Sequence, residues 1–279
     1  MTAPLWDLRT IAGAFHGTAL QDHPVEEGIG GAVLVGDVDP GRLLEAWRAA
    51  RTAAPVTGRW PVFTLPGDLH HEPTAVEIDD LERAAREVDP WTVYRRHRDE
   101  HPMEPWQVES YVRTFLGAER LPLADGLLTV PTSEAALDRW TYETLLADPA
   151  LAENARRWYE SLVGTRTWHP VREAQLVLLP TTSPWLAPAW IGYFGASFPG
   201  GPEAWAAAMR QWHRHWGAEL VAAFSTTLQF VVSRQPQPGM PAWELAGQLL
   251  AVGGSLQHEQ WQLAMAVARS DAWFLHDRP

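Results

Sequence analysis

The sequence contains no cysteine, which excludes both a disulfide framework and thiol chemistry. This absence is typical of proteins of a reducing compartment, so we expect a cytoplasmic protein. The sequence also contains no lysine, and a phosphate-binding loop that ends in Gly-Lys is therefore excluded. All strongly basic side chains are arginines, as in proteins from Ala-, Arg-, Gly- and Pro-rich genomes.

Long apolar runs and targeting signals are missing as well. No apolar stretch approaches the ~20 residues that a membrane-spanning helix needs. The opening residues, MTAPLWDLRT, lack the basic region followed by an apolar region that marks a signal peptide. We therefore expect no membrane association.

Positive charge is scarce in this chain. Its 34 acidic and 22 basic residues give a formal net charge of −12. The densest basic patch, Arg95, Arg96 and Arg98, is followed directly by Asp99 and Glu100. Because nucleic-acid phosphates require a basic surface, we expect no nucleic-acid binding. An acidic surface suits a basic protein partner, or it simply maintains solubility.

Tryptophan is abundant, with 16 residues in 279. An indole combines a large apolar body with one N–H donor, so we expect many of these side chains in the core.

Three helices are predicted to begin at Asp-Pro pairs, namely Asp39-Pro40, Asp89-Pro90 and Asp148-Pro149. Aspartate caps the first free N–H groups of a helix, and proline at the first helical position has no N–H to lose. The strand-like GAVLVG and RWPVFTL enclose the first of these helices, so residues 31–66 predict strand, helix, strand. Pro61 indicates an edge strand or a strand start.

The remaining elements predict the fold class. Residues 67–165 are expected to be mostly helical, with a helix pair over residues 133–148 and 149–164. The later part alternates strands and helices: the expected strands are AQLVLLP, PAWIGYF, AELVAAF, LQFVV and AWFLHD, and the expected helices are 202–216, 241–254 and 260–270. This order predicts an α+β protein with a mostly antiparallel sheet and helices packed on one face. We expect an N-terminal part, 1–165, and a C-terminal α+β domain, 170–279.

The stretch MRQWHRHWGAEL, residues 209–220, places two histidines between two tryptophans. On a helix of about 100° per residue, Trp205, Met209, Trp212 and Trp216 fall on one stripe, which we interpret as the core face. His213 and His215 fall on opposite sides of this stripe. Helical metal ligands need a spacing of three or four residues, so we expect these histidines to border the core and to reach water.

Two other histidine clusters are weak metal candidates. HRDEH, residues 97–101, matches a zinc-peptidase signature, but Pro102 ends the helix directly after it and its flanks are polar. DLHHEP, residues 68–73, offers two histidines and two carboxylates in a loop, where neighbouring side chains diverge and no third ligand is evident. We expect no metal and no cofactor.

Two glycine-rich stretches fail as catalytic motifs. GIGGAV, from Gly28, precedes a strand instead of following one and lacks the third glycine of a dinucleotide loop. GASFPG, from Gly195, has Pro199 where the serine-hydrolase pattern requires glycine, and no Ser–His–acid set is assignable for Ser197.

The C-terminal third resembles a bacterial family named domain of unknown function 4253. The resemblance rests on residues 176–201 and 209–236, on the helix from Trp243, and on the closing AWFLHD; a weaker similarity covers residues 33–66, including Thr-Gly-Arg-Trp-Pro. Members often have Trp-Asn where Ala196-Ser197 stand here, and a Cys-Pro-Asp-like segment where this chain has GGSLQHE. The resemblance supports the division of the fold and implies no reaction.

From these observations we expect a non-enzymatic binding protein, of the immunity type, that sequesters a basic protein partner through an acidic, Trp-rich surface. The alternative is an enzyme with a Trp-lined pocket in the C-terminal domain, near Tyr193, Ser197 and Asp277, and a third possibility is a structural scaffold or an accessory protein. The candidate binding residues are Trp185, Trp190, Tyr193, Ser197, Trp273, His276 and Asp277.

Overall fold

The computed structural model describes residues 8–69, 71–94, 102–121, 123–124, 127–128, 130–164, 168, 171, 173–196 and 200–278. Its helices are α1 (Leu8–Ala14), α2 (Leu43–Thr57), α3 (Ala75–Glu87), α4 (Pro90–Val93), α5 (Pro105–Phe115), α6 (Glu134–Ala147), α7 (Pro149–Ala155), α8 (Gly201–Trp216), α9 (Met240–Val252) and α10 (Gln260–Val267). Short 3-10 helices are η1 (Ile29–Gly31), η2 (Pro40–Arg42), η3 (Ala118–Arg120), η4 (Arg156–Trp158), η6 (Pro184–Ala189) and η7 (Phe194–Ala196).

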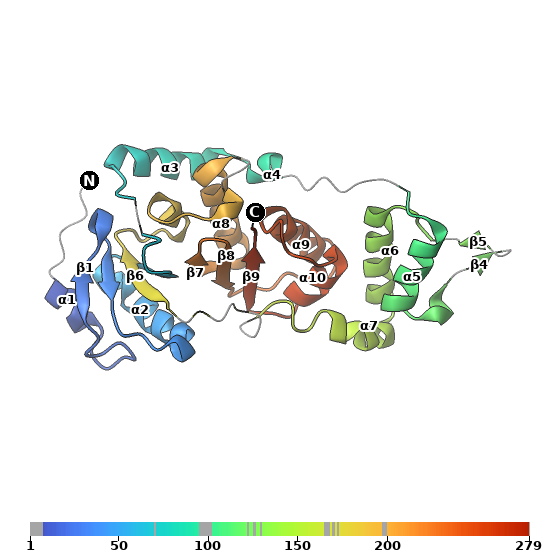
Figure 1. Ribbon diagram of the computed structural model, residues 1–279, viewed down its shortest axis with the longest axis horizontal. Helices are drawn as coiled ribbons and strands as arrows, with labels where there is room; N and C mark the ends of the chain where they lie inside the picture. Colours follow the sequence, from blue (N-terminus) through green and yellow to red (C-terminus); the bar gives the residue numbers. More distant parts are fainter. Residues whose placement is uncertain are drawn as a thin grey trace.

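A seven-stranded sheet extends from the left-hand side to the middle of the molecule as drawn in Figure 1. Its strands are β1 (Val25–Glu27), β2 (Val33–Val35), β3 (Trp60–Thr64), β6 (Gln175–Leu179), β7 (Glu219–Phe224), β8 (Thr227–Val231) and β9 (Ala272–His276), in the order β1-β2-β6-β3-β7-β8-β9. All pairs are antiparallel except β3 with β7, where Phe63 lies opposite Ala222. The predicted α+β class with a mostly antiparallel sheet is confirmed. A separate small hairpin joins β4 (Leu123–Ala124) and β5 (Leu127–Leu128).

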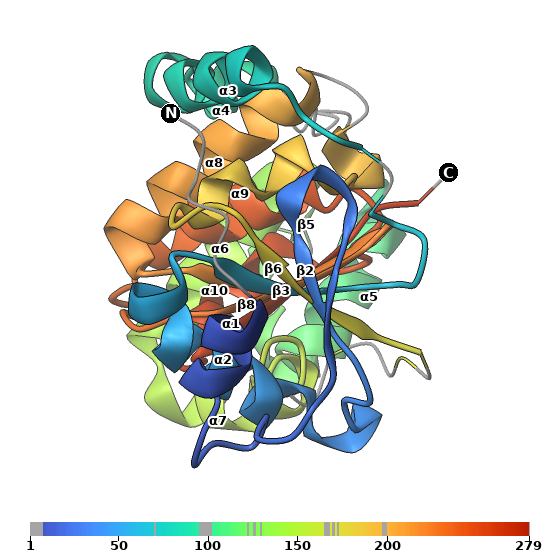
Figure 2. The same ribbon diagram turned by 90° about the vertical axis from the view of Figure 1, so that its left-hand side faces the viewer.

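Aromatic side chains of α2 and of α8 pack against strands of the sheet. Trp60 of β3 contacts Trp47 of α2, with ring centroids 6.3 Å apart. Trp212 of α8 contacts Phe230 and Trp273, at 5.8 and 6.0 Å. Figure 2 shows α8 above the central strands and α2 below them.

The Asp-Pro helix starts are confirmed. Asp39 accepts a hydrogen bond from Gly41 N, Asp89 from Trp91 N, and Asp148 from Leu151 N, at 2.8, 3.1 and 3.0 Å. The strand–helix–strand unit is β2, α2 and β3, and β6 lies between its two strands. Pro61 is the second residue of β3, close to the strand start as expected, but β3 is a central strand and not an edge.

Two predicted elements are wrong. PAWIGYF is not a strand. Prolines 184 and 188 lie in the 3-10 helix η6, and the β pairing of this stretch within the described residues is an isolated bridge from Ile191 to Leu69. The helix expected over 149–164 ends at Ala155 and continues only as η4, so Gly164 does not terminate it. The helix over 133–148 and the helical middle segment agree with the structure.

One hydrophobic core extends from α1 to β9. Strands from both predicted parts of the chain, 1–165 and 170–279, contribute to the one central sheet. The division into those two parts remains a prediction. Among the tryptophans that the structure describes, only Trp106 is exposed, at 68%. The expectation of buried tryptophans is therefore confirmed, because the others are at least partly covered.

Candidate functional site

A pocket of about 580 Å³ lies beyond the carboxyl ends of β3 and β7, which we call the β3–β7 pocket. Because these two strands are parallel neighbours, both end at the same edge of the sheet. The loop after β3 contributes Asp68, and the turn after β7 contributes Ser225 and Thr226. The volume is in the range of pockets that hold small organic molecules, roughly 300–1,000 Å³.

Aromatic side chains form most of the wall. Trp190 and Tyr193 come from the segment between η6 and η7, Phe194 is the first residue of η7, and Trp205 comes from the first turns of α8. The Trp190 indole donates a hydrogen bond to Gly30 O at 3.0 Å, and the rings of Tyr193 and Trp205 lie 5.6 Å apart. These contacts fix the wall before any ligand arrives.

Two glycines shape this segment. A Cβ at Gly195 would lie 2.5 Å from the Tyr193 ring and 2.7 Å from Val252 O, so this close approach of chain segments requires glycine. A Cβ at Gly192, which lines the pocket, would meet no atom within 4 Å. Gly192 therefore leaves open space where any other residue would place a side chain.

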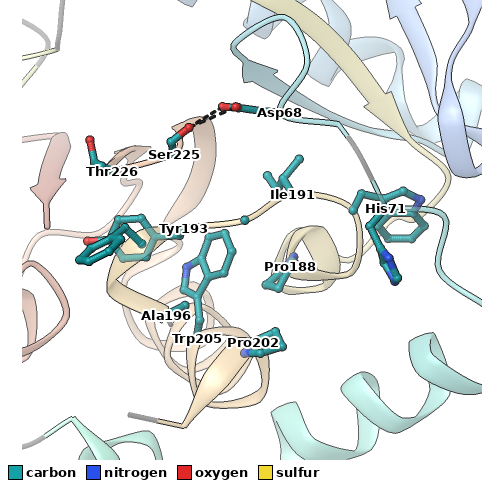
Figure 3. Close-up of a pocket in the computed structure, with 13 residues that line it drawn as sticks. Asp68, His71, Pro188, Ile191, Tyr193, Ala196, Pro202, Trp205, Ser225 and Thr226 are labelled. Carbon is teal, nitrogen blue, oxygen red and sulfur yellow. Dashed lines mark hydrogen bonds between the residues drawn. The ribbon is translucent and has the colours of Figure 1, made fainter. Parts of the chain in front are cut away.

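The polar end of the pocket is a bonded pair. The Ser225 hydroxyl donates to the Asp68 carboxylate, with oxygen–oxygen distances of 3.1 and 3.0 Å (Figure 3). Ser225 has a φ of 52°, a left-handed conformation that is uncommon for serine. Such strain persists where the surroundings hold it, and it is frequent at functional sites.

Neighbouring segments hold the strained turn in place. Phe194 N donates to Ser225 O at 2.7 Å, and Asp277 N donates to Thr226 O at 2.9 Å. His276 Nδ1 lies 3.1 Å from Thr226 O. The pocket wall, the β7–β8 turn and the end of β9 are thus tied together.

His71 lines another side of the pocket, away from the Asp68–Ser225 pair (Figure 3). Its side chain is 52% exposed, and Nε2 lies 3.9 Å from the Glu77 carboxylate. Ser225 bonds directly to Asp68 with no imidazole between them. These three residues therefore do not form a Ser–His–Asp relay.

Burial raises the pKa of Tyr193 well above its usual value, and the nearby negative charge of Asp277 raises it further. The Tyr193 hydroxyl donates to Val252 O at 3.0 Å. The Tyr193 hydroxyl therefore stays protonated at neutral pH and holds the pocket wall against Val252, so it does not act as a general base. The pKa of Tyr94 is raised by burial and by Asp277 in the same way.

The predicted site residues occupy different places. Trp190 and Tyr193 line the β3–β7 pocket. His276 and Asp277 flank its β7–β8 turn, and the Asp277 carboxylate accepts from the Ser255 hydroxyl at 3.1 Å. Ser197 lies outside the described residues.

Trp185 and Trp273 are not at the pocket. The Trp185 indole donates to Glu82 at 2.9 Å and packs against His213. Trp273 is fully buried between Trp212 and Phe230 in the core.

The histidines of the MRQWHRHWGAEL stretch border the core as expected. Trp205, Met209 and Trp212 of the predicted core stripe are 1%, 3% and 1% exposed, whereas Trp216 at the end of the helix is only half-buried. His213 is half-buried, with Nδ1 3.1 Å from Ala218 O, and His215 is exposed.

The other two histidine clusters fall partly or wholly outside the described residues. His97 and His101 of HRDEH lie there, as does His70 of DLHHEP. Within the described part of the chain, no cluster of three or more His, Asp or Glu side chains is arranged to hold a metal ion.

Several pocket residues escaped the sequence reasoning. Asp68 belongs to a loop that we considered only for metal binding, and no motif marks Ser225, Thr226 or Trp205. The positive φ of Ser225 could not be predicted from the turn sequence FSTT, residues 224–227, because glycine or asparagine is the usual residue in that conformation. The helical periodicity predicted that Trp205 lies on the core face of its helix, but it did not predict that Trp205 lines a pocket.

No helix of the described residues is long and apolar enough to cross a membrane.

Known proteins resemble this chain in its C-terminal part. No curated protein and no solved structure matches the chain. The weaker similarity noted at residues 33–66 lies outside the part that a family model matches. Residues 175–277 match the model described as Domain of unknown function (DUF4253), which confirms the resemblance of the C-terminal part to that family.

Proposed function

We propose that this protein binds a small organic molecule in the β3–β7 pocket. The observation that carries the proposal is an aromatic-walled cavity of about 580 Å³ with a bonded carboxylate–hydroxyl pair at one side. An apolar body against aromatic walls gives affinity, and a few placed polar groups give orientation. Phe194, 39% exposed, adds apolar surface that a bound molecule would cover.

The affinity that such a pocket supports is substantial. Burying ~250 Å² of apolar ligand surface contributes ~6 kcal/mol at about 25 cal/mol per Å². The walls are already fixed by Trp190 to Gly30 O and Tyr193 to Val252 O, so little ordering opposes binding. We expect dissociation constants in the micromolar range for apolar molecules that fit.

Capture of a basic protein through an acidic, Trp-rich surface has less support. The described tryptophans other than Trp106 are buried or partly buried, so they do not form an exposed patch. The charge of −12 remains compatible with a basic partner, but it marks no particular surface.

Binding is also better supported than catalysis. The Tyr193 hydroxyl donates a hydrogen bond to Val252 O, and burial keeps the hydroxyl protonated by raising its pKa. Asp68 is bonded to Ser225, but a carboxylate alone is too weak a base to activate a serine hydroxyl at neutral pH. These observations support ligand binding in the pocket more than catalysis there.

A neutral fluorescent probe tests the proposal. N-phenylnaphthylamine emits strongly in apolar surroundings, so titration should show saturable binding of one probe per chain. Replacing Gly192 by Leu fills the open space in the pocket without a clash at Cβ and should weaken binding at least tenfold.

Gly13→Leu is the matched control, because a Cβ at Gly13 in α1 also meets no atom within 4 Å and Gly13 does not line the pocket. It should bind the probe like the parent protein. Equal binding by Gly192→Leu and the parent, with both proteins folded, would show that the probe does not occupy this pocket.

A further inference from the structure

We propose that a second recess of the protein binds the phosphate group of a small polar molecule, such as a sugar phosphate. This recess has a volume of about 600 Å³, and we call it the arginine recess after Arg48, Arg214 and Arg234 on its wall. It lies at the open end of the β7–β8 hairpin, where Glu219 pairs with Val231. The β3–β7 pocket lies at the turn of the same hairpin, and the two cavities share no lining residue. The inference is therefore independent of the proposed function.

Two guanidinium groups on this wall are free to bind a ligand. Arg48 comes from α2 and Arg214 from the last turn of α8, and both side chains are exposed. The backbone carbonyls of these two arginines accept hydrogen bonds, but within the described part of the chain no residue bonds to either guanidinium. Each group therefore offers its N–H donors in a planar fork that matches the oxygens of a phosphate.

The third arginine is already fixed in place. The Arg234 side chain donates to the carbonyls of His213, Arg214 and His215 at 3.3, 2.6 and 3.0 Å. These carbonyls belong to the last turn of α8, and the C-terminal end of a helix carries partial negative charge that repels an anion. Arg234 covers this end with a positive charge and so offsets the repulsion.

Two acids line the arginine recess, and one of them is neutralised. The Glu219 carboxylate accepts from Arg51 Nη2 at 2.8 Å and from Arg51 Nε at 3.2 Å. Asp271 is exposed, and no ion pair joins it to another residue that the structure describes. The three arginines of the wall thus outnumber the one acid that no arginine neutralises. The recess is locally positive in a chain with a formal net charge of −12.

The wall is held in position before a ligand binds. Gly217 ends α8 with a φ of 58°, and a Cβ there would lie 2.0 Å from the Ser233 hydroxyl oxygen, so the helix end packs directly against Ser233. The Arg234 backbone N–H donates to Trp216 O at 3.0 Å beside this contact. The Ser233 hydroxyl bonds to no other described residue, so it provides a further donor for a phosphate oxygen.

The lining and the charge together favour a small polar ligand. No tryptophan, tyrosine or phenylalanine is among the described lining residues, so an aromatic body has no ring to pack against. The volume is in the range of roughly 300–1,000 Å³ that holds small organic molecules, so the phosphate can carry a polar body such as a sugar. A nucleic acid would extend beyond the recess over a chain with 34 acidic and 22 basic residues, which opposes its binding.

The test compares three ligands by isothermal titration calorimetry in phosphate-free buffer at low salt. Ribose 5-phosphate carries the phosphate, ribose is the neutral analogue, and ribonate carries a carboxylate in its place. We expect saturable binding of ribose 5-phosphate, several-fold weaker binding of ribonate, and no measurable binding of ribose. Higher ionic strength should weaken the binding of ribose 5-phosphate, because salt screens exposed charges.

Charge variants locate the site. Replacing Arg48 or Arg214 by Gln should weaken binding of ribose 5-phosphate roughly three- to tenfold, the loss of one exposed charge pair and its hydrogen bonds. Asp271→Asn removes the opposing charge and should strengthen binding. Arg157→Gln is the matched control, because Arg157 is an exposed arginine of η4 outside the recess, and it should bind like the parent protein.

Each outcome supports or overturns the proposal. Binding of ribose or ribonate as tight as that of ribose 5-phosphate would show that the recess does not recognise phosphate. Unchanged binding in both the Arg48 and the Arg214 variants, or an equal loss in Arg157→Gln, would show that the ligand lies elsewhere. Loss of ribose 5-phosphate binding in Gly192→Leu would place it in the β3–β7 pocket instead. Arg214→Gln should leave the binding of N-phenylnaphthylamine unchanged, so failure of this proposal and failure of the proposed function are distinguishable.

Discussion

A buried aspartate in α6 fixes the start of a helix more than a hundred residues later. Asp138 is 0% exposed, and its carboxylate accepts hydrogen bonds from Gln260 N and Trp261 N, each at 3.0 Å. These are the first two amides of α10, which have no partners within the helix. Asp138 therefore caps α10 from another element and attaches α6 to the C-terminal part of the chain.

Replacing Asp138 by Ala should destabilise the protein by ~3–5 kcal/mol. A hydrogen bond to a charged group contributes ~1.5–3 kcal/mol, and alanine leaves two amides without their partner. The amide of Trp261 is buried, whereas Gln260 is only half-buried, so water compensates for part of the loss. Asp138→Asn keeps one acceptor oxygen, and its effect should be ~1–3 kcal/mol.

Urea unfolding, followed by far-UV circular dichroism and tryptophan fluorescence, measures these differences. Glu134→Ala is the matched control, because Glu134 is an exposed acid in the first turn of the same helix. Its loss should cost less than ~1 kcal/mol, the usual contribution of a charge at a helix N-terminus.

Amide hydrogen exchange provides a second readout. Asp138→Ala should accelerate exchange in α10 more than in β7 and β8, because the start of α10 loses its cap. If Asp138→Ala and Glu134→Ala cost the same, or if Asp138→Ala costs under ~1 kcal/mol, the capping argument is wrong.

The remaining predictions concern α8 and helix glycines. Trp212→Ala should cost ~3–5 kcal/mol in urea unfolding, whereas replacing His213 and His215 together by Gln should cost under ~1 kcal/mol; a stable Trp212→Ala protein would show that the core face is misassigned. Gly217 ends α8 with a φ of 58°, so Gly217→Ala should destabilise the protein by ~1–2 kcal/mol, because an L-residue is strained in that conformation. Gly13 lies inside α1 without close neighbours, so Gly13→Ala should instead stabilise the protein by up to ~1 kcal/mol. A change of the same sign in both glycine variants would contradict this reasoning.

Local chemistry made much of the fold predictable. Each Asp-Pro start was identifiable because a cap and the proline that follows it act within a few residues. The hairpin of β7 and β8 and the helix α8 were evident from apolar periodicity, and Gly217 marked the end of that helix. PAWIGYF misled because its apolar run has strand length, while the two prolines of η6 impose a 3-10 conformation.

The β3–β7 pocket could be predicted only in part. Trp190 and Tyr193 were candidates as aromatic residues of a Trp-lined pocket in the C-terminal part, and both line the β3–β7 pocket. Trp185 and Trp273 were candidates on the same ground, but they contact α3 and the core instead. The residue type does not state which side of a segment meets solvent, so the sequence could not separate these tryptophans.

What the sequence determined by itself was local: the caps, the apolar stripe of α8, the burial of most described tryptophans, and the exclusion of thiol and Gly-Lys phosphate-loop chemistry. Tertiary structure decided what depends on distant partners. The parallel pairing of β3 with β7 brings Asp68 to Ser225, 157 positions apart. Asp138 reaches Trp261 across 123 positions. Such contacts exist because sheet order and helix packing place separate segments together, and neither leaves a periodic pattern within one segment.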